Sequence, residues 1–537
     1  MKKIVSNSWV LLILSGFLLI PAWYEWGTGL VLLIAFIPLL IVFDKSFEKK
    51  AKAGTVFLQA SLTFLVWNLG DTWWIRNALV DGKPSYAGVS AAILVSTLFM
   101  SIPIWLAYLA RKRFGRDVGF FALVVFWLAY EFSYLHGEVS WPWLTLGNGF
   151  MYNVKLMQWY SFTGAMGGSM WLLVANILIY KTFFSEKGEY KIQPKNGWKA
   201  AAVVFIPIII SFVLFYTYKE TENPRKVIVV QPNVDPYLKF NDVPPLEQTK
   251  IQVDLARELA DSTVDYVVAP ETSVMNNIWI GEFDRVPDFK LIRSFQKQFP
   301  GLKYITGIMC YQMYPKDSPV PPTAKEYRNG FYFDSYNSSI QIDSTPEIQL
   351  YHKSKLVIGV EKMPYPGILK ILEPIMLKLG GTFRSHNTQP EREAFSAPNN
   401  SVRVGTPICY ESVYGEFVGE FVQEGANLLF VITNDGWWGN TPGYRQHNAI
   451  SSIRAIETRR SIARSANTGI SSFINQRGEV LQSLGWWKRG ALIDTLNAND
   501  KLTFYVKHGD YIGRIAFFAG IFIVLSLIVA RLKREKS

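Results

Sequence analysis

The stretch Arg403-Val404-Gly405-Thr406-Pro407-Ile408-Cys409-Tyr410-Glu411 reads as a short, largely apolar strand that ends at a cysteine followed by polar residues. A free cysteine is usually a small hydrophobic residue of a core, and composition alone favours that role. A position at the end of a strand, directly before Tyr410 and Glu411, is unusual for core packing. The stretch therefore favours a reactive thiol at Cys409.

The chain of 537 residues has only two cysteines, Cys310 and Cys409. Two cysteines exclude a disulfide framework and leave either one reactive thiol or one Cys310–Cys409 disulfide. Cys310 ends an apolar stretch and is predicted to lie in a core. The five histidines are scattered and form no cluster with the spacing of metal ligands, so we expect neither a metal nor a cofactor.

Short apolar strands alternate with helices around Cys409. Strands are predicted at 226–231, 266–269, 304–308 and 428–433, helices at 246–259 and 445–465, and two polar-edged strands joined by a turn at 330–342. This alternation predicts an α/β sandwich over residues 218–510. Catalytic groups gather at strand ends in such folds, and Glu271, like Cys409, follows an apolar strand.

A thiol must lose its proton before it attacks a carbonyl carbon. Glu271 could accept that proton as a general base, although a carboxylate after a strand is also common at a helix N-terminus. Lys353 could stabilise an oxyanion. Lys355 suits that role equally by charge, and the alternation of a strand places both lysines on one face, so the residues alone leave the choice open.

Apolar runs long enough to cross a bilayer flank this domain. We predict spans near 7–23, 29–44, 55–70, 87–110, 117–135, 156–180, 200–217 and 513–530. The predicted fold class is a polytopic α-helical membrane protein of about eight spans with an inserted α/β domain. The predicted domains are a transmembrane bundle at 1–217, a catalytic domain at 218–510, and a final span with a basic tail at 511–537.

Lysine and arginine residues cluster in one set of connecting segments, whereas the opposite short loops contain few. The rich segments are 2–3, 45–52, 111–116, 181–199 and 531–536, and the poor loops hold only Arg76, Lys83 and Lys155. The positive-inside rule therefore predicts cytoplasmic termini and an external position for 218–510. The net charge of +12 comes largely from these flanks, so no nucleic-acid partner is predicted.

The loops on the external side are rich in tryptophan and nearly free of charge. These tryptophans are Trp67, Trp73, Trp74, Trp141 and Trp143. We predict an interfacial aromatic belt for most of them, and the alternative is that some line a lipid access route. Glu131 near the outer end of the fifth span is either a functional carboxylate or one that snorkels to the interface.

Several motifs of the chain resemble those of the nitrilase superfamily. They are Val230-Gln231-Pro232-Asn233, Ala269-Pro270-Glu271, Tyr351-His352-Lys353, Ile408-Cys409-Tyr410-Glu411 and Asn434-Asp435-Gly436-Trp437. That superfamily carries a Glu-Lys-Cys triad on an αββα sandwich. With the spans on both sides and Trp141-Pro142-Trp143-Leu144, nearly the whole chain is similar to the apolipoprotein N-acyltransferase family, the membrane-embedded members of the superfamily.

The resemblance implies Glu271 as the base, Lys353 as the oxyanion stabiliser and Cys409 as the nucleophile, and so selects Lys353 over Lys355. It implies supporting roles for a second group of residues, Glu361, Tyr410 and Glu411, with the Tyr410 peptide N–H suited to an oxyanion hole. Candidates for substrate or lid contacts are Phe240, Trp279 and Trp437. The family usually reads Leu-Val-Pro-Phe-Gly-Glu after the lysine, whereas this chain has Leu356-Val357-Ile358-Gly359-Val360-Glu361.

The implied reaction is transfer of a fatty acyl chain from a phospholipid, typically phosphatidylethanolamine, to the α-amine of the diacylglyceryl-cysteine of an apolipoprotein. It runs by a ping-pong mechanism through a thioester on Cys409. The resemblance also implies a monomer in the bacterial inner membrane, with the catalytic domain in the periplasm.

Such a thioester must be shielded from water. The amphipathic segment 367–379 and the segment 275–280 are candidate shields, and Gly380-Gly381 is a candidate hinge. Two other functions compete: a membrane-tethered amidase or nitrilase that hydrolyses a carbon–nitrogen bond, and a non-catalytic transporter or receptor. Eight spans exceed what a tether needs, and the presence of all three triad residues argues against a receptor.

Overall fold

The computed structural model describes residues 7–80, 83–240, 242–358, 360–362, 385–398 and 400–535. The candidate shield 367–379 and the hinge Gly380-Gly381 lie outside the described residues. The chain divides into two compact units. The first comprises Met1–Arg76, Tyr86–Thr217 and His508–Ser537, and the second comprises Asn77–Ser85 and Tyr218–Lys507.

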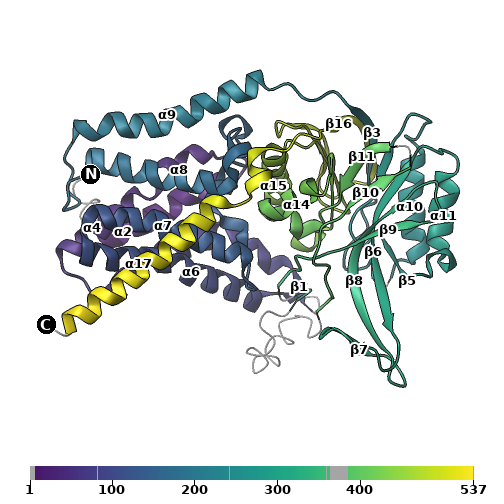
Figure 1. Cartoon of the computed structure of the whole chain (residues 1–537), viewed down its shortest axis with the longest axis horizontal. Helices are drawn as coiled ribbons and strands as arrows, with labels where there is room; N and C mark the ends of the chain where they lie inside the picture. Colours follow the sequence, from purple (N-terminus) through teal and green to yellow (C-terminus); the bar gives the residue numbers. More distant parts are fainter. Residues whose placement is uncertain are drawn as a thin grey trace. The chain divides into compact units, whose positions relative to one another are not determined.

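The first unit is helical. Among the described residues, seven helical segments are long and apolar enough to cross a membrane: Gly29–Glu48, Ala53–Asn77, Tyr86–Phe114, Arg116–His136, Tyr160–Phe183, Pro194–Thr217 and Tyr511–Lys533. The remaining predicted span corresponds to a shorter apolar helical segment, Ser8–Trp23. Figure 1 shows the main helices as α2 (Ser8–Leu19), α4 (Ile37–Glu48), α6 (Tyr86–Phe114), α7 (Arg116–His136), α8 (Tyr160–Phe183), α9 (Pro194–Thr217) and α17 (Tyr511–Glu535). The predicted polytopic helical class is confirmed.

The interfacial belt predicted for the tryptophans is wrong for three of them. Trp67, Trp74 and Trp143 are at most 1% exposed and belong to the core of the helical unit. The Trp143 ring stacks on Trp141 at a centroid distance of 5.3 Å, and Trp23 meets Trp67 edge-on at 5.1 Å. Backbone carbonyls accept the ring N–H groups of Trp23 and Trp74, so these large rings are buried without losing their hydrogen bonds.

Glu131, on α7, is also a structural residue of this unit. Its side chain is 3% exposed and accepts hydrogen bonds from Trp127 Nε1 at 2.9 Å and from the Leu146 backbone N–H at 2.8 Å. The carboxylate therefore joins α7 to the short helical turn Leu146–Phe150. It does not snorkel to an interface.

The second unit contains two large β-sheets. One has the order β16-β3-β4-β6-β8-β7, with β5 on β6 and β9 on β8, and the other has the order β10-β11-β12-β13-β14-β15. The bounds in the first sheet are β3 (Pro224–Gln231), β4 (Tyr266–Val268), β5 (Val274–Trp279), β6 (Lys303–Tyr314), β7 (Lys325–Glu326), β8 (Tyr332–Ile342), β9 (Ile348–His352) and β16 (Gly490–Asn497). Those in the second are β10 (Ala394–Ala397), β11 (Asn400–Gly405), β12 (Leu428–Thr433), β13 (Ile462–Ala466), β14 (Ser471–Ile474) and β15 (Val480–Leu484).

The two sheets pack face to face. The Tyr266 ring on β4 meets the Phe430 ring on β12 at 5.2 Å, and Ser465 Oγ on β13 donates to the Val230 carbonyl on β3 at 2.8 Å. Strands β3, β4 and β6 are mutually parallel, as are β11, β12 and β13. The carboxyl ends of each set therefore meet at one edge of its sheet.

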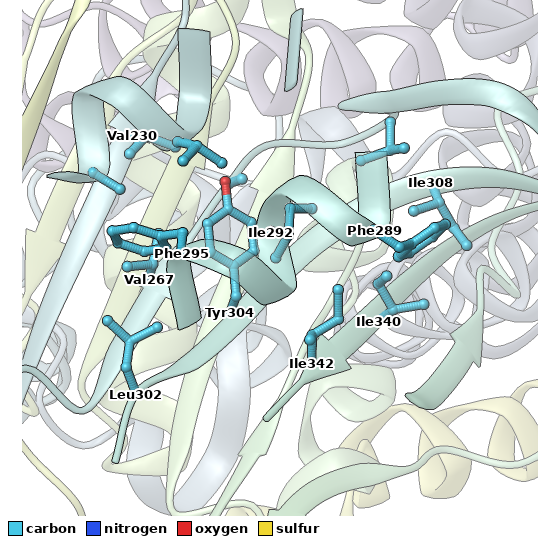
Figure 2. Close-up of a cluster of buried hydrophobic side chains, with 14 of the residues drawn as sticks. Val230, Val267, Phe289, Ile292, Phe295, Leu302, Tyr304, Ile308, Ile340 and Ile342 are labelled. Carbon is cyan, nitrogen blue, oxygen red and sulfur yellow. The ribbon is translucent and has the colours of Figure 1, made fainter. Parts of the chain in front are cut away.

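Helices cover the outer face of each sheet. Helices α10 (Pro245–Arg257) and α11 (Pro287–Gln296) pack on the first sheet, and α14 (Gly415–Gln423) and α15 (Pro442–Thr458) on the second. Figure 2 shows the core under α11, where Phe289, Ile292 and Phe295 meet Tyr304 and Ile340 of the sheet. The apolar faces of these helices and strands are buried together, which gives the predicted αββα sandwich.

Two element predictions are corrected. Residues 332–342 form one strand, β8, and not two, because its serine and asparagine side chains are buried and hydrogen-bonded, not placed in a turn. The helix predicted over 445–465 ends at Thr458, since Arg459 adopts a left-handed conformation with φ of 50°. Arg464 consequently lies on strand β13.

The stretch 275–280, predicted as a possible lid, largely coincides with strand β5, which pairs with β6. The Trp279 ring packs against Tyr311 and Phe333 at centroid distances of 5.4 and 6.2 Å. This stretch belongs to the sheet.

Candidate active site

Two strand ends converge on one buried ion cluster. Glu271 follows β4, Lys353 follows β9, and Lys353 Nζ lies 2.9 Å from Glu271 Oε1 and 3.0 Å from the Glu361 carboxylate. Asn337 Nδ2, on β8, donates to Glu271 at 2.8 Å and to Glu361 at 2.9 Å. The structure thus brings three of the predicted site residues into direct contact.

Cys409 lies beside this cluster. Its side chain is buried, and the charges of both Glu271 and Lys353 act on its thiol. Both cysteines of the chain are free, so the disulfide alternative is excluded. Cys310 lies on β6 against Ser338, where burial raises the pKa of its thiol to about 12.

The structure also separates the two lysines that the residues alone could not distinguish. Lys353 is 1% exposed and bonded to two carboxylates. Lys355 Nζ instead lies over the Tyr414 ring at 5.1 Å. Of these two lysines, Lys353 is the one bonded to the Glu271 carboxylate.

Cys409 occupies a strained backbone conformation, with φ of 51°. Such a conformation costs of the order of 1–3 kcal/mol in a residue other than glycine and persists only where its surroundings hold it. Two side chains hold the Cys409 carbonyl: Ser412 Oγ donates to it at 2.7 Å, and His447 Nε2 lies 3.1 Å from it. The turn that begins at Cys409 is thereby fixed from the carbonyl side.

Glu411 joins the lysine loop to the cysteine loop. One carboxylate oxygen accepts the Ser354 N–H at 2.6 Å and the Tyr351 hydroxyl at 2.9 Å, and the other accepts the Ile408 N–H at 2.8 Å. Ser354 follows Lys353, and Ile408 precedes Cys409. This buried carboxylate therefore fixes the spacing of the loops that carry Lys353 and Cys409. Tyr410 is also buried, with its ring edge-on to Tyr414.

The charges of the cluster determine which groups carry protons. Burial alone would lower the pKa of Lys353, but the carboxylates of Glu271 and Glu361 outweigh it and hold that pKa well above its ordinary value. Burial would raise the pKa of Glu361, but Lys353 and the Val357 and Asn337 donors lower it. Lys353 is therefore a permanent ammonium held between two carboxylates, which suits it to stabilise an oxyanion.

The thiol is protonated at rest. Burial raises the pKa of Cys409, the Glu271 carboxylate raises it further, and Lys353 only partly offsets them. Among the described residues, both side chains that donate to Glu271 do so to Oε1, which leaves Oε2 for the thiol. This arrangement suits proton transfer from Cys409 to Glu271 as the sulfur attacks, not a standing thiolate.

A second network below Cys409 was not predicted from sequence. His447 Nδ1, on α15, lies 2.8 Å from Asp435 Oδ1, and Arg464 Nη2 lies 2.7 Å from Asp435 Oδ2. Burial would raise the pKa of Asp435, but Arg464 and His447 outweigh it and lower that pKa. The only sequence signal was the Asn434-Asp435-Gly436-Trp437 motif, because His447 and Arg464 reach the site from separate elements.

Ligating atoms of Cys409, Asp435 and His447 all lie within 4.8 Å of one another, a proximity that residue spacing did not reveal. A bound cation would face the Arg464 guanidinium, which lies 3.0 Å from His447 Nδ1 and is bonded to Asp435. Because a fixed positive charge occupies this cluster, its donors suit a hydrogen-bond network that positions Cys409 better than they suit a metal.

We expect His447→Ala to lower the rate of Cys409 alkylation by iodoacetamide about 10- to 100-fold, because a loosened Cys409 carbonyl lets the thiol move relative to Glu271. The rate would be measured by mass spectrometry of the Cys409 peptide. Arg445→Ala, on the same helix with its side chain toward Asn440, is the control and should react at the wild-type rate. An unchanged rate in His447→Ala would contradict a positioning role for the imidazole.

Two aromatic candidates from the sequence lie together. The Phe240 ring stacks on Trp437 at 6.0 Å, and Tyr237 meets Trp437 edge-on at 5.1 Å. Trp437 also lines a hollow of about 290 Å³ whose other walls include Tyr237 and Trp487. Because Trp437 follows Asp435 by two residues, this aromatic surface is directly connected to the network below Cys409.

The chain is similar to known proteins in both sequence and structure. Residues 15–178 match the family model described as Apolipoprotein N-acyltransferase N-terminal domain, and residues 310–500 match that of Carbon-nitrogen hydrolase. An apolipoprotein N-acyltransferase of Chlorobaculum tepidum is 28% identical over 547 residues, covering 99% of this chain and 98% of the relative. One of Geobacter metallireducens is 24% identical, covering 98% and 96%. Among solved structures, an amidase from Nesterenkonia sp. matches with a TM-score of 0.36 and 14% identity, covering 54% of this chain and 95% of the amidase.

Proposed function

Because the chain belongs to the apolipoprotein N-acyltransferase family, an acyltransferase branch of the nitrilase superfamily, we propose the following reaction for it. It transfers a fatty acyl chain from a phospholipid, phosphatidylethanolamine in particular, to the α-amine of the diacylglyceryl-cysteine of an apolipoprotein. The single observation that carries the proposal is the buried Glu271–Lys353 pair beside the Cys409 thiol.

The first half-reaction forms a thioester. Glu271 takes the proton of the Cys409 thiol as the sulfur attacks the carbonyl carbon of the phospholipid ester. The oxyanion that develops is stabilised by the Lys353 ammonium and by the Tyr410 backbone N–H. The intermediate then breaks its carbon–oxygen ester bond, Glu271 returns the proton to the leaving oxygen, and a lysophospholipid departs from the acyl-enzyme.

The second half-reaction uses the same groups in reverse order. The α-amine of the acceptor attacks the thioester carbon and gives a proton to Glu271, and Lys353 again faces the oxyanion. Breakage of the carbon–sulfur bond releases the amide, and the thiolate regains its proton from Glu271. Because one base serves both halves and the first product leaves before the second substrate reacts, the kinetics are ping-pong.

The setting of the reaction is also part of the proposal. The seven long apolar helical segments make the chain a membrane protein. The basic connecting segments favour cytoplasmic termini and a periplasmic catalytic unit in the inner membrane of a bacterium. There the enzyme acts as a monomer, with phospholipid from the bilayer as donor and a lipid-anchored protein as acceptor.

The test is mass spectrometry of the full-length protein after incubation with phosphatidylethanolamine in lipid nanodiscs. We expect one fatty-acyl adduct on the Cys409 peptide, released by hydroxylamine, with an equal amount of lysophospholipid. Addition of a diacylglyceryl-cysteine peptide should discharge the adduct into an N-acyl product. An adduct on Cys310 would refute the assignment of the nucleophile. Release of ammonia from amides without lysophospholipid would instead identify a carbon–nitrogen hydrolase.

A further inference from the structure

Lys239 is a buried cation of the second unit that the reaction described above does not use. It is only 3% exposed, and its Nζ donates to the backbone carbonyl of Glu271 at 3.1 Å and to Thr272 Oγ1 at 2.9 Å. A lysine is almost never fully buried unless it is paired. A buried ammonium directed at the residue that carries the base calls for a functional explanation.

The main chain that carries Lys239 is itself held in place. Gln248 Nε2, on α10, donates to the Lys239 carbonyl at 2.7 Å, and the Lys239 N–H donates to the Asp235 carbonyl at 2.9 Å. The Lys239 backbone therefore has fixed partners on both its N–H and its carbonyl. A side chain that extends from such a point can hold what it binds in a defined position.

The target of Lys239 is a strained turn. Thr272 has a φ of 50°, directly after Glu271. Gly307 of β6 lies so close below that a Cβ atom there would sit 2.6 Å from Glu271 Cα and from the Thr272 nitrogen. The turn is thus pressed against the sheet on one side and bonded by Lys239 through its carbonyl and hydroxyl oxygens. A left-handed residue other than glycine needs such support.

We propose that Lys239 is a positioning residue that holds the turn at Glu271–Thr272, and that its charge balances the second carboxylate of the ion cluster. The proposal rests on the proposed function, in which Glu271 is the base, and it adds a residue that acts on Glu271 from behind. Lys239 does not touch the substrate.

The charges support the second part of this proposal. Within the described part of the chain, the Lys353 ammonium is paired with both Glu271 and Glu361, so one positive charge faces two carboxylates and leaves an excess negative charge. Lys239 supplies the compensating positive charge, and the Glu271 carboxylate in turn stabilises its ammonium. Burial nevertheless lowers the pKa of Lys239 to about 7, so its proton is held less firmly than that of Lys353. An excess buried charge would favour protonation of a carboxylate, and a protonated Glu271 cannot act as a base.

The test separates this role from acyl transfer by using a reagent that needs no lipid. Full-length Cys310→Ala protein is the background, and alkylation of Cys409 by iodoacetamide is followed by mass spectrometry from pH 6 to about pH 10. We expect Lys239→Met to slow alkylation near neutral pH by about 10- to 100-fold, and Lys239→Arg to recover part of the loss. The melting temperature of each variant shows whether it is folded. If Lys239→Met does not fold, Lys239→Gln replaces it in the alkylation assay.

Lys303→Met is the matched control. Lys303 is also a buried lysine of the second unit, and burial also lowers its pKa, but it lies at the amino end of β6 against the Tyr266 ring. Its substitution should leave alkylation unchanged. Equal slowing by Lys303→Met, or a wild-type rate in Lys239→Met, would overturn the proposal.

Acyl-enzyme formation from phosphatidylethanolamine, measured on the same proteins, keeps the two proposals apart. If Lys239→Met slows alkylation while the background protein forms no acyl-enzyme, the role of Lys239 stands and the proposed function fails. If the background protein acylates normally and Lys239→Met matches it in both assays, the proposed function stands and the role of Lys239 fails.

Discussion

Substitution of Cys409 by alanine is expected to abolish acyl transfer, with a loss of at least about 10⁴-fold, while Cys310→Ala retains nearly full activity. Cys409 is the sulfur beside Glu271 and Lys353, and without it no thioester can form. Cys310 is also buried but lies on β6 against Ser338, where its thiol is structural. The measurement is N-acylation of a diacylglyceryl-cysteine peptide by purified protein in nanodiscs.

The two substitutions form a matched pair, because each removes one buried sulfur from the same unit. Circular dichroism and melting temperature should show that both variants fold, so a difference in activity can be assigned to chemistry. Residual transfer in Cys409→Ala above a few per cent would show that a thioester on this sulfur is not on the reaction path. A complete loss in Cys310→Ala would move the nucleophile to the other cysteine.

The parts of this site that could be predicted from sequence are those encoded by short segments. Glu271, Lys353 and Cys409 each follow a strand within a few residues, so the alternation of strands and helices places them at sheet edges. The contact between Lys353 and Glu361 was expected only from the family resemblance, since the intervening loop departs from the usual motif. The same alternation predicted an α/β sandwich, because apolar strands are recognisable one at a time. The αββα layering was expected only from the family resemblance.

The parts that could not be predicted are buried polar side chains whose partners are far away in sequence. Asn337 and Lys239 reach Glu271 from β8 and from the turn before α10, and His447 reaches the Cys409 carbonyl from α15. Their residue types are those of an ordinary polar surface, and only the fold buries them. The prediction of two strands joined by a turn at 330–342 is wrong for the same reason, because these residues include the buried polar side chains of the single strand β8. A buried polar strand looks like a loop until its hydrogen-bond partners are known.

The tryptophans of the helical unit show that the burial of aromatic side chains is equally hard to predict. Aromatic residues at the ends of apolar helices are typical of a membrane interface, yet Trp67 and Trp143 pack inside the unit. The position of a tryptophan along a helix does not indicate whether its ring faces the membrane or the interior of the unit. Packing between helices decides it, and that information is not local.

Substitution of Glu271 by glutamine should lower the rate of acyl-enzyme formation by about 10²- to 10⁴-fold near neutral pH, the range expected for loss of a general base. Glutamine has nearly the same shape and keeps an oxygen for Lys353 and Asn337, but it cannot take the thiol proton. The measurement is single-turnover formation of the Cys409 thioester. Glu258→Gln, beyond the end of α10, is the control and should behave like the wild type.

The pH dependence of the rate provides a second, independent test of this prediction. The Glu271 carboxylate helps to raise the pKa of the Cys409 thiol, and Lys353 opposes it. In Glu271→Gln the carboxylate charge is gone while Lys353 remains, so the pKa of the thiol should fall. The variant is then slower than the wild type at pH 7, where the wild type can use its base, but its rate should rise steeply as the pH approaches the lowered pKa and the thiolate forms unaided.

The dependence of the Glu271→Gln rate on pH therefore distinguishes a general base from a merely structural carboxylate at this position. Loss of a structural residue would lower the rate by the same factor at every pH, since the geometry would be damaged whatever the state of the thiol. Loss of the base should produce a deficit that shrinks with increasing pH, because hydroxide takes over the removal of the proton. A pH-independent deficit in Glu271→Gln would remove Glu271 from the reaction and leave it as a partner that only holds Lys353.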